Sequence, residues 1–269
     1  MKNLLVINLL AFFTILGCDN TALTNKPYID PHIIFTSRRW WNYDIFITDI
    51  YGHHKTHLTK NKWLDFNPTV SKDGSKLAFI SNRDGNREIY ILELIWLDGY
   101  TQWEGRNLRN ITNSVENDWT PIFSPVSDKI AFASYFPSND NYDIFIMNSD
   151  GSDKINITNS SGYEKFPQFS PDGSFIIYQG WQKGKMEIFF SNLLEGNNIN
   201  VTRNILSNDI ISHGKSISPD GQKIVFQSLR DGPTNWEIYI MNMDGSGQLN
   251  LTNDPRTDYS YVILPLKNL

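Results

Sequence analysis

The chain repeats one cassette five times, and this repeat constrains the fold more than any other feature. Each copy has an acidic residue that opens a run of β-branched and aromatic residues, such as Asp143-Ile-Phe-Ile. A threonine preceded by an aliphatic residue follows each run, 15 residues after the acid in four copies and 24 in the second. The pairs of acid and threonine are Asp44 and Thr59, Glu88 and Thr112, Asp143 and Thr158, Glu187 and Thr202, and Glu237 and Thr252. A spacing kept this closely indicates a repeated structural unit.

Each cassette contains signals for four β-strands. The first is short and ends at an Asp-Gly turn, as in Pro167-Gln-Phe-Ser before Pro171-Asp-Gly, where glycine supplies the positive φ of a tight hairpin. The second is apolar at successive positions, as in Leu77-Ala-Phe-Ile, which predicts burial of both strand faces. The acid-led run forms the third strand, and the threonine lies on the fourth. Four-stranded units of roughly 45 residues are typical of β-propeller blades.

The two ends of the repeat complement each other. His32-Ile-Ile-Phe matches a second strand, whereas Asp258-Tyr-Ser-Tyr-Val-Ile matches the first strand that begins at Asp118. We therefore expect the C-terminal strand to complete the N-terminal blade, which closes the ring and removes exposed sheet edges. The predicted fold is all-β, a five-bladed β-propeller of four-stranded antiparallel blades, with six blades as the alternative. The predicted blades are 31–60 with 258–264, then 65–113, 118–159, 164–203 and 209–253.

The N-terminus has the features of an export signal. Lys2 precedes an apolar run from Leu4 to Leu16, which is shorter than the approximately 20 residues that a membrane span needs. Ile15-Leu-Gly-Cys18 resembles the lipobox of bacterial lipoproteins, and this implies that Cys18 is acylated and becomes the mature N-terminus. A buried core cysteine is the alternative. We expect residues 1–17 to be a lipoprotein signal peptide, 18–30 a lipidated tether and 31–269 the propeller.

Charge and cysteine content narrow the classes of partner. The net charge is −5, and removal of residues 1–17, which hold one lysine and no acid, makes it −6. A mildly acidic chain without a basic run is a poor nucleic-acid binder, so we expect no nucleic-acid partner. Cys18 is the only cysteine, so the mature chain has no disulfide. The expected location is the periplasmic side of the cell envelope or the cell surface, with Cys18 as the membrane anchor.

The fifth cassette carries a recognisable set of motifs. Ser218-Pro-Asp-Gly, Ile224-Val-Phe, Ser228-Leu-Arg, Glu237-Ile-Tyr-Ile-Met and Asn250-Leu-Thr resemble the WD40-like repeats of the TolB β-propeller family. The resemblance covers nearly all of residues 31–264. It implies a role in protein interactions at the cell envelope, with an envelope protein or peptide as partner. TolB itself has six blades and a further N-terminal α/β domain, and this chain departs from that pattern in both respects.

Acidic and aromatic residues precede the predicted innermost strands. The acids are Asp65, Asp118, Glu164 and Asp258, and the aromatic residues that follow them are Phe66, Trp119, Phe166 and Tyr259. The fifth blade differs, with Asp209 displaced and Ile210 in the aromatic place. One interpretation is an anionic, aromatic-lined channel mouth that binds a basic peptide, a cation or a sugar. The other is that each acid accepts backbone hydrogen bonds within its own blade, with Arg39, Arg83 and Arg230 as partners.

Aromatic residues also occur in the loops that follow the second strands. They are Trp40, Trp41, Tyr135, Phe136, Trp181 and Trp236, and they predict either a recognition surface or packing between blades. The nine additional residues of the second cassette lie around Trp96, Tyr100 and Trp103, where a decorated hairpin is favoured over a second contact site. Adjacent histidines such as His53 and His54 seldom converge on a metal, so we expect no metal site. We also expect no cofactor, since the sequence contains no Walker or dinucleotide-binding motif.

Two functional hypotheses follow from the sequence. The first is a non-catalytic scaffold that binds a protein or peptide through the acidic face. The second is a carbohydrate-active enzyme or sugar-binding propeller with Asp65, Asp118 and Glu164 as candidate residues. Glycoside hydrolysis needs two carboxyl groups at about 5 Å or about 6.5–9.5 Å. Acids that repeat with the blade favour the first hypothesis, because a catalytic pair is asymmetric.

Overall fold

The chain forms an all-β structure, as the repeat predicts. The computed structural model describes residues 32–39, 42–97, 102–182, 184–202, 211–232, 235–253 and 258. Within these ranges the secondary structure consists of strands β1 to β19 without a helix. The strands form five separate antiparallel sheets, each built from consecutive strands.

Each sheet corresponds to one predicted blade. The first contains β1 (His32–Arg39), β2 (Asn42–Asp49) and β3 (Thr56–His57), and the second β4 (Asp65–Val70), β5 (Lys76–Ser81), β6 (Glu88–Leu97) and β7 (Gln102–Asn110). The third contains β8 (Asn117–Phe123), β9 (Lys129–Phe136), β10 (Asn141–Asn148) and β11 (Ile155–Asn156). The fourth contains β12 (Lys165–Phe169), β13 (Phe175–Gln182), β14 (Lys185–Asn192) and β15 (Asn198–Asn200). The fifth contains β16 (Ile211–Ile217), β17 (Lys223–Ser228), β18 (Glu237–Asn242) and β19 (Leu249–Asn250).

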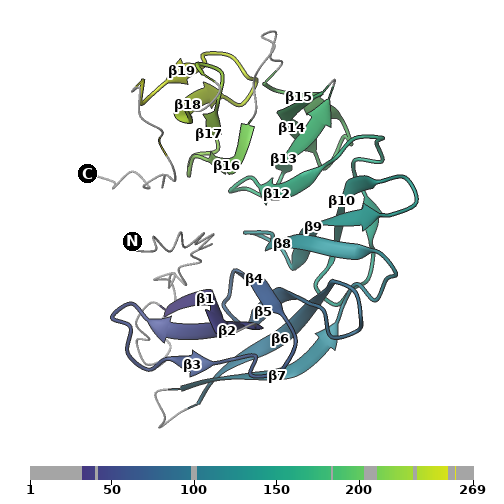
Figure 1. Ribbon diagram of the computed structural model, residues 1–269, viewed down its shortest axis with the longest axis vertical. Helices are drawn as coiled ribbons and strands as arrows, with labels where there is room; N and C mark the ends of the chain where they lie inside the picture. The colour runs from purple at the N-terminus through teal and green to yellow at the C-terminus, as the bar shows by residue number, and fades with distance from the viewer. Residues whose placement is uncertain are drawn as a thin grey trace, which may run out of the picture.

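The sheets follow one another in chain order around a common centre, with β4, β8, β12 and β16 innermost (Figure 1). Neighbouring sheets pack against each other through β2 and β4, β4 and β8, β8 and β12, and β14 and β16. This arrangement is that of propeller blades. The strand that residues 258–264 are expected to add to the first blade lies, beyond Asp258, outside the described residues, so ring closure and the total of five blades stay predictions.

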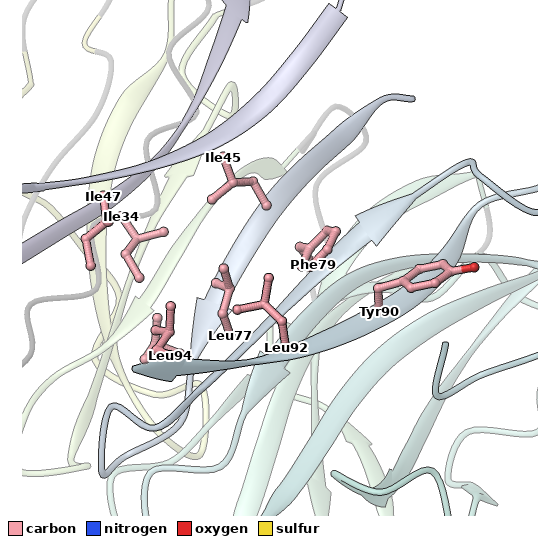
Figure 2. Close-up of a cluster of buried hydrophobic side chains, with 9 residues drawn as sticks. Ile34, Ile45, Ile47, Leu77, Phe79, Tyr90, Leu92 and Leu94 are labelled. Carbon is pink, nitrogen blue, oxygen red and sulfur yellow. The ribbon is translucent and has the colours of Figure 1, made fainter. Parts of the chain in front are cut away.

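The hydrophobic core is divided into clusters, each of which joins two neighbouring blades. Ile34, Ile45 and Ile47 of the first blade meet Leu77 and Phe79 of the second (Figure 2). The other clusters join the second blade to the third, the third to the fourth and the fourth to the fifth. A fully buried Phe or Ile contributes roughly 1.5–3 kcal/mol, so blades depend on their neighbours for stability.

Successive residues of a second strand serve different clusters. In β5, Leu77 and Phe79 face the first blade, whereas Ala78 packs with Ile130 and Phe132 of the third. All five side chains are buried. Because neighbouring side chains point to opposite sheet faces, the continuous apolar run fills two interfaces at once. The predicted burial of both strand faces is confirmed.

The turns show why Asp-Gly recurs. Asp73 Oδ1 accepts hydrogen bonds from Ser71 Oγ at 2.6 Å and from the Ser75 backbone N–H at 3.1 Å. Gly74 between them has φ of 72°, a left-handed conformation that glycine adopts without strain. Gly151 has a second reason to be glycine, since a Cβ there would lie 2.6 Å from the carbonyl oxygen of Ile111 in the preceding blade.

The innermost strands contain a bulge that the sequence did not predict. Their pairing register shifts in every described copy, for example between Phe66 and Thr69 in β4. Asn67, Thr120 and Phe166 occupy the bulge with φ of 53°, 49° and 56°. Positive φ is costly for threonine and phenylalanine. The bulge lets the strand continue back to its acid, so β4 begins at Asp65 rather than near Pro68.

The additional residues of the second cassette lengthen the hairpin of β6 and β7, and its side chains pack onto the first blade. Trp96 and Trp103 lie edge to face with centroids 5.3 Å apart. Both rings also contact the His32 ring, at 5.6 and 5.4 Å. Trp103 packs against the cluster between the first two blades. The interpretation as a decorated hairpin is therefore supported, with a packing role for Trp96 and Trp103; Tyr100 lies outside the described residues.

Candidate functional site

The acids that open the third strands stabilise their own blades. Thr158 Oγ1 donates to Asp143 Oδ1 at 3.1 Å and accepts the backbone N–H of Ile144 at 2.9 Å. The Ser160 backbone N–H also donates to Asp143, at 3.1 Å. The same threonine-to-acid bond recurs at Glu88, Glu187 and Glu237. The structural interpretation of these acids is supported, since the repeat of acid and threonine ties the fourth strand to the third.

The acids of the innermost strands lie on what we call the inter-blade face, formed by the connectors 58–64, 111–116 and 157–164 and the loops 82–87 and 137–140. The backbone N–H of Asp118 donates to the carbonyl of Arg87 at 2.7 Å, and that of Glu164 to Tyr142 at 3.0 Å. The N–H of Asp258 donates to Trp236 at 2.7 Å, the equivalent position of the fifth blade. The backbone of Asp258 therefore bonds to the preceding blade in the same way as the backbones of Asp118 and Glu164 do. This agrees with the prediction that an innermost strand begins at Asp258.

These carboxylates are buried rather than displayed. The exposed fractions of Asp65, Asp118 and Glu164 are 0%, 1% and 5%. A serine of the connector links two acids in successive blades. Ser114 donates its backbone N–H to Glu88 at 3.0 Å and its hydroxyl to Asp118 at 3.1 Å. The predicted anionic surface is thus replaced by buried carboxyl groups beneath the connectors.

One of these acids has a guanidinium partner. Arg83 Nη2 lies 3.1 Å from Asp65 Oδ1 and 3.2 Å from Oδ2, and Asn61 donates to Oδ2 at 2.6 Å. The predicted partnership of Arg83 is confirmed. The equivalent positions of the third and fourth blades hold Phe136 and Trp181, so no arginine follows the second strand there. Arg230 instead donates to Gln248 at 2.5 Å, and the side chain of Arg39 lies outside the described residues.

Asp118 and Glu164 consequently have raised pKa values. Burial raises the pKa of Asp118 to about 6, and the Glu88 charge adds to the effect. Burial likewise raises the pKa of Glu164 to about 7, with Asp143 contributing. Within the described part of the chain, Asp118 Oδ1 and Glu164 Oε2 have no hydrogen-bond donor. Both carboxyl groups can therefore hold a proton near neutral pH.

The fifth blade lacks an acid at this position. Ile211 pairs with Ser228 as Asp65 pairs with Ser81 and Asp118 with Ser134. An apolar residue thus takes the place of the carboxylate. This agrees with the predicted departure of the fifth blade, although Asp209 and Ile210 lie outside the described residues.

The predicted aromatic positions are only partly equivalent. Phe66 and Trp119 each follow their acid directly, and their ring centroids lie 6.3 Å apart, edge to face. Phe166 instead occupies the bulge, where the other blades have Asn67 and Thr120. Phe166 follows its acid by two residues, and Lys165 holds the position that is equivalent to Phe66 and Trp119. Tyr259 lies outside the described residues.

The loop aromatics divide between packing and exposure. The Tyr135 ring lies 4.7 Å from Tyr142, and Phe136 lies 6.0 Å from Phe145 of its own blade. Trp181 is 46% exposed. Trp40 and Trp41, like Cys18, lie outside the described residues. The structure therefore leaves Trp181 accessible, as a recognition surface requires.

Sequence reasoning missed the cations of the inter-blade face. The Arg87 guanidinium lies over the Trp119 ring, 3.9 Å from its centroid, and the Lys165 ammonium lies 3.7 Å from the Tyr142 centroid. Lys215 of β16 is half-buried and donates to the carbonyl of Phe166, and burial lowers its pKa to about 7. Alignment of the repeats could have identified Lys165, because it directly follows Glu164, where the second and third blades have the aromatic residues Phe66 and Trp119.

In the part of the chain that the structure describes, no three or more histidine, cysteine, aspartate or glutamate side chains are grouped to hold a metal ion. Across the same residues, no helical segment has the length and hydropathy of a membrane span.

Comparison with known proteins agrees with the repeat motifs. The sequence model of the family described as the TolB beta propeller domain matches residues 99–265, more than half of the chain. The chain belongs to the TolB β-propeller family. A TolB homologue from Chlorobium luteolum is 30% identical over 175 residues, which cover 65% of this chain and 36% of that protein. The matches cover between 24% and 46% of the length of four curated relatives, three of which are TolB homologues.

Solved structures share the TolB-type propeller fold. TolB from Acinetobacter baumannii is 20% identical with a TM-score of 0.59, and the match covers 82% of this chain and 52% of that one. Oligogalacturonate lyase from Vibrio parahaemolyticus is 18% identical with a TM-score of 0.58, covering 77% and 59%. At these identities the likeness shows the fold alone, and the fold carries both binding proteins and enzymes.

Proposed function

We propose that this chain is a lipid-anchored propeller of the cell envelope that binds a protein or peptide through its inter-blade face, without catalysis. Membership of the TolB β-propeller family supports the proposal, as does the lipobox-like Ile15-Leu-Gly-Cys18. The acids that repeat with the blade are engaged in hydrogen bonds that stabilise the fold. We therefore assign partner binding to the residues that the connectors expose.

The observation that carries the proposal is an apolar residue displayed on this face. Val115 is 88% exposed in the connector 111–116. Its neighbours are fixed, because Asn86 Nδ2 donates to the carbonyls of Ser114 at 3.0 Å and Glu116 at 2.6 Å. A variable loop held on rigid strands is the usual place for a binding residue, and apolar side chains at the centre of a contact favour protein partners.

Crosslinking in intact cells tests this proposal. A photoreactive amino acid at position 115 is expected to capture a protein partner. The matched control is position 194, because Leu194 is 91% exposed in the turn between β14 and β15, on the opposite face. Capture at both positions to the same extent, or at position 194 alone, would contradict the assignment of the binding face.

The anchor gives a separate prediction. Replacing Cys18 with serine is expected to abolish metabolic labelling with a radioactive fatty acid and to release the chain from membranes, because stable attachment needs acyl chains. Labelling and membrane fractionation of cells measure the two effects. A serine variant that stays in the membrane fraction would contradict anchoring through Cys18.

A carbohydrate-active enzyme is the second candidate. The raised pKa values of Asp118 and Glu164 favour it, since a general acid must hold a proton near neutral pH. Such an enzyme would release reducing ends or unsaturated products from a glycan panel, and Glu164→Gln would abolish the release. Absence of product across the panel would exclude this candidate.

A further inference from the structure

Two cations of the inter-blade face are held by aromatic rings instead of carboxylates. The Arg87 guanidinium lies 3.9 Å from the Trp119 centroid. The Lys165 ammonium lies 3.7 Å from the Tyr142 centroid and 4.3 Å from that of Tyr163. Among the described residues, neither cation makes an ion pair within 4.0 Å. Their charges are therefore fixed in position but not neutralised by a direct partner.

The two cations belong to one patch, which we call the cationic ledge: Arg87, Trp119, Tyr142, Tyr163 and Lys165. Tyr142 lies within it, because its ring contacts Tyr163 at 4.6 Å and Trp119 packs against the same core cluster. Arg87 also acts on Tyr142, lowering its pKa against the larger effect of burial. The ledge thus spans the junction of the second, third and fourth blades.

Two of the nearby carboxylates are withdrawn from this surface, whereas that of Asp140 is exposed. Asp118 and Glu164 are 1% and 5% exposed and are bound to connector serines. Asp140 acts on Lys165 from a distance and accepts the Tyr135 hydroxyl at 3.0 Å. Arg87 and Lys165 are both half-buried, and this burial lowers the pKa of each cation. An incoming anion would restore the stabilisation that water no longer provides.

We propose that the cationic ledge binds an acidic peptide segment of the partner, with Arg87 and Lys165 as carboxylate-binding residues and Val115 as an apolar contact. This inference rests on the proposed function and reverses the charge of the partner that the acidic residues of the sequence suggested. A peptide fits better than an acidic sugar, because the cations cover faces of the Trp119 and Tyr142 rings on which a sugar would stack. The exposed Val115 fits an apolar side chain between two acidic ones.

Fluorescence anisotropy with the full chain tests the inference. The probe is a short labelled peptide in which glutamate alternates with leucine, and the controls carry glutamine or lysine in place of glutamate. Arg87→Gln and Lys165→Gln are each expected to weaken binding of the glutamate peptide about tenfold, the effect of one charge-assisted hydrogen bond. Lys223→Gln is the matched control, since Lys223 begins β17 on the opposite face. Thermal unfolding of each variant checks that the fold is intact.

The outcomes are distinct. The cationic ledge is supported if Arg87→Gln and Lys165→Gln lose binding of the glutamate peptide and Lys223→Gln retains it. Equal binding by all variants, absence of binding, or preference for the lysine peptide overturns it. Preference for an oligogalacturonate competitor over the peptide overturns it in favour of a sugar. In each of these cases crosslinking at position 115 still decides the proposed function, because that capture does not depend on the partner's charge.

Discussion

Replacing Arg83 with methionine is expected to lower the free energy of unfolding by about 3–5 kcal/mol. Asp65 is fully buried, and Arg83 supplies its positive charge at 3.1 Å. Methionine fills much of the same volume but leaves the carboxylate without a counter-charge, which is the costly way to break a buried ion pair. The guanidinium also lies 4.5 Å from the Tyr90 centroid, so the variant loses that contact too. Urea denaturation measures the change.

An exposed pair provides the control. Arg106 lies 2.7 Å from Glu104 with both side chains about half exposed, so Arg106→Met is expected to cost less than about 1 kcal/mol. The double variant Arg83→Met with Asp65→Leu is expected to recover most of the loss, since it removes both buried charges. Equal stability of the Arg83 and Arg106 variants would contradict the importance of the buried pair.

The strands and several of their contacts could be predicted from the sequence, because they depend on local patterns. The spacing of acid and threonine translates directly into the bond between Asp143 and Thr158. The continuous apolar run of β5 translates into two inter-blade interfaces. Ser-x-Arg gave the partner of Asp65 because the arginine follows a strand that pairs with β4. Each of these inferences requires only the sequence of one blade and the length of the repeat.

The site was harder to predict because it depends on register and on depth. The bulge places Thr120 and Phe166 at positive φ without a glycine to indicate it, so the sequence alone does not show that Phe166 occupies a different backbone position from Phe66. One of the two interpretations placed the acids at the surface, but the connectors cover the acids, and burial of that kind depends on how blades stack. Trp96 and Trp103 contact His32, which is distant in sequence. No local pattern contains such a contact.

Glu164→Gln is expected to raise stability at pH 8 by about 1–2 kcal/mol and to leave it nearly unchanged near pH 4. The pKa of Glu164 is about 7 in the folded chain, above its ordinary value of 4.5. The folded state therefore holds this proton more tightly, and the chain loses stability as the pH rises from the ordinary pKa through 7. Glutamine mimics the protonated acid at every pH. The figure is kept below the value that corresponds to the full shift, because the effective dielectric constant around a buried carboxyl group is higher than that of a dry protein interior.

Thermal unfolding at a series of pH values between 4 and 8 measures this effect. Asp118→Asn is expected to behave similarly, with its gain developing between about pH 4 and pH 6 and staying constant above that, since burial raises the pKa of Asp118 from 3.8 to about 6. Glu195→Gln is the matched control, because Glu195 is exposed in a turn. If Glu164→Gln and the unaltered chain lose stability in parallel as the pH rises, Glu164 is already ionised without cost. The buried carboxyl would then have a donor, and its place as a proton-holding group on the inter-blade face would be lost.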